Sequence, residues 1–352
     1  MNMDIRVFVR AAAMLAMVVA SLSASGAVVT WDGGGADDNW STAANWSLDL
    51  LPTSSDDVII TNVTGIAMVN VNATVKSITV QNGAFLRIEP GQILTVSNGS
   101  LIAAGGNLHV TSTATWSGNG LLSVNGAVNM NGNSTIDGSG GLTINSGGSL
   151  DVVSNASFSI ISRSTTNYGT ITLQNDVMTG ITFNGDELAN VGVIDFQTNQ
   201  GINTTMGTPV LTNLSGGIIK KTVGSGSAAI TFPVDNQAGG TIQVQTGSLA
   251  LNGGGTGSGT YSISAGKTLT LGGGTLTLTG SPTFSGAGTL SIAGGTLNAA
   301  TSVTLNNVTL SSAGTITGTS AVNLSGNFNW SGGTISGSGS RVINLGSTPS
   351  IT

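Results

Sequence analysis

The chain has 352 residues, a net charge of −6, no cysteine and one histidine. Only 7% of its residues are charged and 54 are glycine, whereas ordinary globular domains carry about 25% charged residues. The lack of cysteine excludes disulfides and cysteine-ligated zinc. The acidic balance argues against nucleic acid as a partner, because a phosphate backbone is bound by a basic surface.

Residues 1–27 have the features of a secretory signal peptide. Two arginines precede an apolar stretch over residues 11–20, and the small residues Ser25 and Ala27 fit a cleavage site. This stretch is too short to span a bilayer core of about 30 Å, although an uncleaved anchor is the alternative interpretation. We therefore expect export through the Sec pathway to a secreted or cell-surface location, with no transmembrane segment in the mature chain.

Residues 28–66 predict an N-terminal capping segment. Three of the five tryptophans lie here (Trp31, Trp40 and Trp46), together with six aspartates and no Lys or Arg. Large tryptophan side chains suit the covering of the open sheet edge that a first coil exposes. Two other interpretations stay open: an aromatic platform for sugars, and a calcium site built from the paired aspartates, whose spacing matches no EF-hand loop.

Residues 67–352 are assigned to repeats with a period of 19–23 residues. In the first part, three glycines lie 21 residues apart (Gly99, Gly120 and Gly141), and each precedes an apolar strand start (Leu101, Leu121 and Leu142). Near the end, three Gly-Thr pairs lie 19 residues apart, beginning at Gly295, Gly314 and Gly333. Asn-Gly pairs leave an antiparallel meander of hairpins as the rival fold. Turn signals recur about three times per period, which favours a three-sided coil.

The repeat is clearest over residues 167–258, where four asparagines stand 23 residues apart: Asn167, Asn190, Asn213 and Asn236. A fixed period of this size indicates stacked repeats, and such a unit holds about three short strands with their turns. We therefore predict an all-β solenoid. The asparagines either form a hydrogen-bonded ladder along the stack or adopt a left-handed turn conformation before glycine, and both interpretations are open.

Two stretches carry a family resemblance. Residues 31–60, WDGGGADDNWSTAANWSLDLLPTSSDDVII, resemble the opening of large bacterial secreted or surface proteins built of β-strand repeats. Residues 236–280 and the phrase NWSGGTISGSG at 329–339 are similar to their repeat regions. Some of these proteins resemble autotransporter passenger domains and filamentous adhesins. The resemblance covers nearly the whole mature chain. It implies a right-handed parallel β-helix that is exported and often on the cell surface, and it implies no catalytic residues.

Groups that could perform catalysis are few, and we assign no catalytic, metal or cofactor site. After Asp235 the chain contains no Asp or Glu, although general acid–base catalysis needs a proton carrier beside the substrate. The single histidine, His109, alternates with apolar residues and is expected on a polar face. The basic pair Lys220-Lys221 is expected in a solvated turn.

One constellation keeps an enzymatic alternative open. Asp186, Glu187 and Asp195 would resemble the carboxylates of polysaccharide-cleaving β-helix enzymes, with Arg163 and Lys220 as the nearest cations in sequence. Such a site requires these carboxylates to lie on one face.

The sequence thus predicts an exported, non-enzymatic β-solenoid that serves as a cell-surface stalk, an adhesin or an extracellular matrix component. Glycans or other surface components are the expected partners, and the sequence does not indicate an oligomeric state. The alternative is a polysaccharide-binding or polysaccharide-cleaving protein. A third hypothesis is ice binding through Thr-x-Thr units at 268–270, 275–277 and 277–279, whose spacing does not repeat at the coil length. We expect either a chain that continues beyond Thr352 or a short irregular tail.

Overall fold

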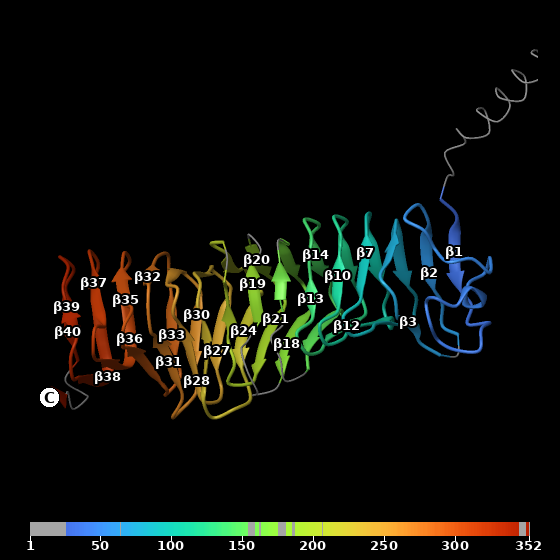
Figure 1. Cartoon of the computed structure of the whole chain (residues 1–352). Helices are drawn as coiled ribbons and strands as arrows, with labels where there is room; N and C mark the ends of the chain where they lie inside the picture. Colours follow the sequence, from blue (N-terminus) through green and yellow to red (C-terminus); the bar gives the residue numbers. More distant parts are fainter. Residues whose placement is uncertain are drawn as a thin grey trace, which may run out of the picture.

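The computed structural model describes residues 26–63, 65–153, 159–161, 163–174, 181–184, 187–205, 207–344 and 350–351 (Figure 1). The predicted signal peptide therefore lies outside the described residues except for its last two. No helix in the described part is long and apolar enough to cross a membrane. Among the described residues a single 3₁₀ helix spans Ala43–Asn45, and the other regular structure is strand.

The strands form three parallel sheets, here called A, B and C, and each strand from β2 to β32 pairs with the strand three positions further along the chain (Figure 1). Each coil in this range therefore contributes one strand to each sheet, as a three-sided solenoid requires. The predicted parallel β-helix is confirmed. The antiparallel meander is wrong, because every strand pairing among the described residues is parallel.

Sheet A consists of β1 (Val28–Trp31), β2 (Asp57–Ile60), β5 (Ser77–Val80), β8 (Ser100–Ile102), β11 (Leu122–Val124), β14 (Leu142–Ile144), β17 (Thr165–Asn167), β20 (Glu187–Asn190), β23 (Val210–Asn213), β26 (Val234–Asn236), β29 (Gly255–Gly257), β32 (Thr275–Leu278), β35 (Thr296–Ala299), β37 (Thr315–Gly318) and β39 (Thr334–Ile335). Sheet B consists of β3 (Ala67–Val69), β6 (Phe85–Ile88), β9 (Asn107–Val110), β12 (Ala127–Met130), β15 (Ser149–Val152), β18 (Thr170–Gln174), β21 (Val193–Gln197), β24 (Ile218–Lys221), β27 (Thr241–Val244), β30 (Thr260–Ile263) and β33 (Thr283–Ser285). Sheet C consists of β4 (Ala73–Val75), β7 (Ile93–Val96), β10 (Thr115–Ser117), β13 (Thr135–Ile136), β16 (Ser159–Ile161), β19 (Ile181–Asn184), β22 (Ile202–Asn203), β25 (Ser227–Ile230), β28 (Ser248–Leu251), β31 (Thr268–Leu271), β34 (Thr289–Ile292), β36 (Val303–Leu310), β38 (Val322–Trp330), β40 (Arg341–Ile343) and β41 (Ser350–Ile351).

Near the C-terminal end two faces merge into one bent strand. β36 and β38 are 8 and 9 residues long, and their pairing register shifts between Asn306 and Val308. Asn307 at the bend has a φ of 52°. The first half of β36 lies against β33 and the second half pairs with β34. The first half therefore continues the stack of sheet B, and the second half continues sheet C.

The core is a continuous apolar column inside the coil. Along most strands buried and partly exposed residues alternate, as in β12 and β27, because successive side chains of a strand point to opposite faces. Val, Ile and Leu occupy most inward positions, and aromatic residues, Ala and a few polar residues occupy the others. Alternation in the sequence therefore translates directly into an inner and an outer face for each sheet.

The four repeated asparagines form a ladder at the ends of sheet A strands. Each pairs in register with the next, and the side-chain Nδ2 of Asn167, Asn190 and Asn213 donates to the Oδ1 one coil further on at 2.8 Å. These asparagines are at most 1% exposed. The ladder interpretation is confirmed. The left-handed turn is wrong at these positions, because none of the four has a positive φ.

One predicted register is wrong by a residue. Leu122 pairs with Ser100 on one side and with Leu142 on the other, so Gly120 does not align with Gly99 and Gly141. A shift of one residue turns a side chain to the opposite face of a strand. As a result Leu121, predicted to begin an apolar strand, is 48% exposed.

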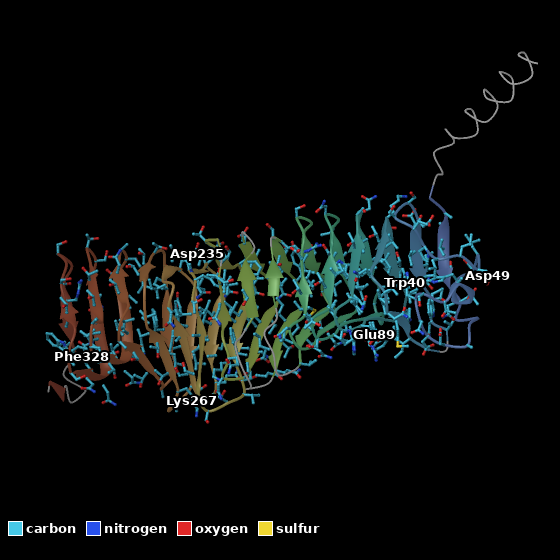
Figure 2. All side chains as sticks on the ribbon, in the orientation of Figure 1. Trp40, Asp49, Glu89, Asp235, Lys267 and Phe328 are labelled. Carbon is cyan, nitrogen blue, oxygen red and sulfur yellow. The ribbon has the colours of Figure 1, made fainter. Side chains whose placement is uncertain are left out.

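The N-terminal segment forms a cluster of tryptophans at the first coil. Trp31, Trp40 and Trp46 are 1–2% exposed and contact one another edge to face, with ring centroids 4.5–5.0 Å apart. The backbone beside them covers the free edge of β3: Trp40 N donates to Met68 O at 2.7 Å, and Met68 N donates to Asp38 O at 2.9 Å. Figure 2 labels Trp40 at this end of the rod. The sugar-platform alternative is wrong, because buried rings offer no stacking surface.

Candidate functional site

The carboxylates of the enzymatic alternative do not converge. Glu187 lies on β20 of sheet A, where its Oε1 accepts a hydrogen bond from Thr212 Oγ1 at 2.8 Å. Asp195 lies on β21 of sheet B and is 6% exposed, with Lys220 Nζ 3.4 Å away and Thr222 Oγ1 donating at 2.7 Å. Asp186 lies outside the described residues. Because the two described carboxylates are on different faces, the site fails its geometric requirement.

Arg163 is a buried structural group that bonds backbone carbonyls. Its guanidinium is 0% exposed and donates to backbone carbonyls of two underlying turns, including Gly118 O at 2.7 Å, Asp137 O at 2.7 Å and Gly140 O at 3.0 Å. Burial lowers the pKa of Arg163 from its ordinary value. The guanidinium therefore holds stacked turns together and does not face the carboxylates.

The solvated turn predicted for the basic pair is wrong, because both lysines lie on strand β24. Lys220 faces outward on β24, but Lys221 points inward and is 0% exposed. Its ammonium group donates to Thr198 O at 2.8 Å and Val223 O at 2.6 Å. The strand alternation explains the difference, because neighbouring residues of one strand must face opposite sides.

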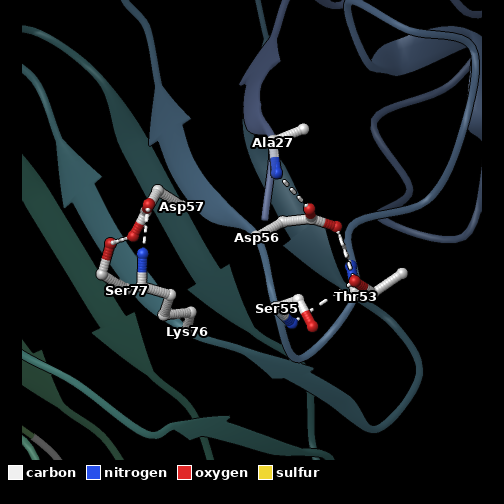
Figure 3. Close-up of polar contacts among 7 residues, drawn as sticks. All are labelled: Ala27, Thr53, Ser55, Asp56, Asp57, Lys76 and Ser77. Carbon is white, nitrogen blue, oxygen red and sulfur yellow. Dashed lines mark hydrogen bonds and ion pairs between the residues drawn. The ribbon is translucent and has the colours of Figure 1, made fainter. Parts of the chain in front are cut away.

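The aspartates of the cap accept hydrogen bonds from the protein (Figure 3). Asp56 accepts from Ala27 N at 2.8 Å and from Thr53 N and Oγ1 at 2.8 and 2.7 Å. Asp57 accepts from Lys76 Nζ at 2.7 Å and Ser77 Oγ at 2.5 Å. Among the described residues no three Asp, Glu or His side chains lie close enough to hold a metal ion together.

The outer face of sheet B, at its N-terminal end, gathers chemically distinctive side chains. From β6 to β15 two rows face outward in register. One row holds Phe85, Asn107, Ala127 and Ser149, and the other holds Arg87, His109, Asn129 and Asp151. Neighbouring members of a row stand about 4.8 Å apart along the stack. Figure 2 shows Glu89, which follows β6, on the lower side of the rod, opposite Asp235 of sheet A.

His109 faces outward on this surface, as its alternation predicts. Its ring meets the Phe85 ring edge to face, with centroids 4.4 Å apart. Burial lowers the pKa of the imidazole, and the neighbouring Arg87 lowers it further. At neutral pH the ring is therefore uncharged and offers one donor and one acceptor. Arg87 itself donates to Glu89 Oε1 at 2.5 Å.

A groove of about 590 Å³ adjoins these rows at the corner between sheets A and B. The corner of the middle coil has only two residues, Asn125–Gly126, whereas the corners on either side have four, residues 103–106 and 145–148. The three coils stack directly on one another, so the short corner is recessed between two longer ones. The rim includes Gly105 and Ser146, and the outward residues Asn107, Ala127 and Ser149 form part of the lining.

Single threonines stack in rows on sheet A. On sheet A, four threonines pair in register: Thr275, Thr296, Thr315 and Thr334. A second row beside them holds Thr256, Thr277, Asn298 and Thr317. Between the Thr-x-Thr units at 275–277 and 315–317 the intervening coil carries Thr296 and Asn298, so the unit itself does not recur in every coil, as its spacing indicated. The units at 268–270 and 275–277 lie on different sheets.

Comparisons with known proteins identify no activity. Residues 30–131, less than a third of the chain, match the model of a family described as a domain of unknown function (DUF8693). No curated protein matches the chain. The chain is similar to the crystal structure of a TibC-catalyzed hyper-glycosylated TibA55-350 fragment, with 18% identity over 84% of this chain and 92% of that chain and a TM-score of 0.26. This likeness is too weak to carry an argument, so the fold assignment depends on the strand pairing of the chain itself.

Proposed function

We propose that the protein is an exported, non-enzymatic β-solenoid with a structural or adhesive role, as a cell-surface stalk, an adhesin or an extracellular matrix component. One observation carries the proposal. The described residues build one continuous stack of parallel coils, and their carboxylates are dispersed or bonded within the protein. Such a rod offers long, regular, weakly charged sides, which suit contact with glycans and other surface components through hydroxyl and amide groups.

Cell fractionation with an immunoblot tests the location. We expect the protein in the medium or on intact cells, where externally added protease removes it. Deletion of the gene is expected to reduce attachment of the cells to surfaces or to one another. Unchanged attachment together with an unchanged envelope would contradict the structural and adhesive role, and a protein retained inside the cells would contradict export.

Ice binding is a second candidate function, supported by the threonine rows of sheet A. The side-chain hydroxyls of Thr275, Thr296, Thr315 and Thr334 make no hydrogen bond among the described residues. They repeat about every 4.8 Å along the stack, with a second row about 6.6 Å away along the strands. A two-dimensional array of this kind can match an ordered surface. Thermal hysteresis of the purified protein tests the idea, and its absence would dismiss ice binding.

A further inference from the structure

The groove at the short corner has the shape of a binding site for an extended ligand. It exists because Asn125–Gly126 replaces the four-residue corners found one coil before and one coil after. Its volume of about 590 Å³ is within the usual range of about 300–1,000 Å³ for ligand sites. Gly147 on one rim has open space where a side chain would stand, so the groove is accessible from that side.

The lining offers neutral hydrogen-bonding groups and no charged side chain. The side chains of Asn125 and Ser146 make no hydrogen bond within the described part of the protein, and Asn107 uses only its Nδ2, which donates to Gly105 O at 3.2 Å. Amides and hydroxyls both donate and accept hydrogen bonds. They therefore match the hydroxyl groups of a sugar, which also do both.

The charges beside the groove disfavour an anionic ligand. Asp151 lies two residues after the lining residue Ser149 and accepts a hydrogen bond from the Ser149 hydroxyl at 2.7 Å. The nearby cation Arg87 is already paired with Glu89 at 2.5 Å. An acidic sugar would thus meet a carboxylate and no unpaired cation on this face. A neutral sugar avoids this repulsion and can accept hydrogen bonds from the amides.

Phe85 supplies the apolar part of the surface. It faces outward on β6, one coil from Asn107 in the same row, and is only partly buried. Its edge contact with His109 fixes the ring. A sugar ring has an apolar face of C–H groups that can pack on the ring of Phe85. The small side chain of Ala127 leaves room for the sugar above the floor of the groove.

We propose that this groove, with the row from Phe85 to Ser149, binds a neutral glycan chain. The proposal rests on the proposed adhesive function and names the class of ligand that the function would use. The chain lies across the recessed corner of β11 and β12, with its hydroxyls bonded to Asn125, Asn107 and Ser146. No covalent chemistry is involved.

The test measures binding of the whole mature chain to a panel of neutral hexasaccharides of β-1,4-linked glucose, mannose, xylose and N-acetylglucosamine, with hexagalacturonate as the acidic comparison. Ligand-observed NMR and calorimetry report the affinity. We expect at least one neutral hexasaccharide to bind more tightly than hexagalacturonate. Absence of binding by every neutral probe, or tighter binding of hexagalacturonate, would overturn the proposal.

Matched variants locate the site. Ala127→Phe fills the groove from its floor and is expected to weaken binding at least about tenfold, or about 1.4 kcal/mol. Asn125→Ala removes one hydrogen-bonding side chain and is expected to weaken it severalfold. Ala189→Phe, on the outer face of β20 in sheet A, adds the same ring elsewhere and should leave binding unchanged. Circular dichroism checks that each variant folds. If Ala127→Phe does not fold, Asn125→Ala still tests whether the groove is the binding site.

The outcomes separate this proposal from the adhesive role. Equal binding by the wild type, Ala127→Phe and Asn125→Ala would overturn the groove as the site. If gene deletion still impaired attachment, the adhesive role would stand without it. Binding that is lost in both groove variants and kept in Ala189→Phe would support the groove.

Discussion

Buried polar side chains inside the solenoid bind backbone and amide groups that stacking would otherwise leave without partners. Arg163 bonds the carbonyls of two turns, Lys221 bonds two carbonyls, and the asparagine ladder links four coils. A buried polar group without a partner costs about 1–3 kcal/mol. These side chains are therefore structural, and their burial makes them unavailable to a ligand.

The central rung of the ladder gives the first prediction. Asn213→Ala removes an acceptor for Asn190 Nδ2 and a donor to Asn236 Oδ1, and it leaves a small cavity. We expect the free energy of unfolding to fall by about 2–4 kcal/mol, measured by urea denaturation. Asn82→Ala, at an exposed turn, is the control and should change little. Equal effects of the two substitutions would show that the ladder adds no stability.

The single histidine allows a direct measurement of its environment. Burial and the positive charge of Arg87 both disfavour the imidazolium, so the pKa of His109 is lowered from its ordinary value of about 6.5. NMR titration of a protein without a histidine tag should show one imidazole signal that titrates below this value. Arg87→Ala should raise the pKa, and urea-unfolded protein should return it to about 6.5. A native value at or above 6.5 would contradict the described surroundings.

At the scale of the elements, strand register decides which residues reach the surface. The regular Gly-Thr spacing near the C-terminus predicts the pairing of Thr296, Thr315 and Thr334 correctly. The glycine spacing before residue 142 does not, because corner lengths differ between coils: four residues at 103–106 and two at Asn125–Gly126. Variation in corner length changes the register relative to a constant period, and it also creates the groove.

The cap is expected to loosen in acid. Hydrogen bonds from Thr53 and Ala27 hold the pKa of Asp56 below its ordinary value. Because the pKa of Asp56 is lower in the folded state, its stabilising effect is fully present at a pH above the pKa of the unfolded state, about 3.9. This effect is lost as the pH falls through the pKa of the folded state. Tryptophan fluorescence reports mainly on the cap, which holds three of the five tryptophans. The midpoint temperature of thermal unfolding, followed by this fluorescence, should decrease as the pH is lowered through this range.

Two variants test this assignment to Asp56. Asp56→Asn should lower the midpoint at neutral pH and weaken its dependence on acid. Asp49→Asn changes an exposed carboxylate of the same segment and should behave as the wild type does. If both variants kept the full acid dependence of the wild type, Asp56 would not be the group responsible.

Across the whole molecule, stability comes from stacking and depends little on charge. Among the described residues the ion pairs are Lys76–Asp57, Arg87–Glu89 and Lys220–Asp195. Salt screens exposed pairs strongly, with a Debye length of about 3 Å at 1 M. Raising sodium chloride from low concentration to about 1 M should therefore shift the melting temperature by less than about 3 °C. A large decrease would show that charge pairs carry a major share of the stability.

The sequence by itself determined the β-solenoid and the asparagine ladder as one of two alternatives. These features depend on local alternation, on a constant period and on residue types that suit stacked turns, all of which can be counted along the chain. Only the tertiary structure decided between the ladder and the turn. It showed that Lys221 and Arg163 are buried and that Glu187 and Asp195 lie on different faces. It also placed Phe85, His109 and the recessed corner on one surface. These outcomes depend on which residues lie side by side in successive coils. The length of each corner changes this register, and the repeat period of the sequence does not show where a corner is longer or shorter.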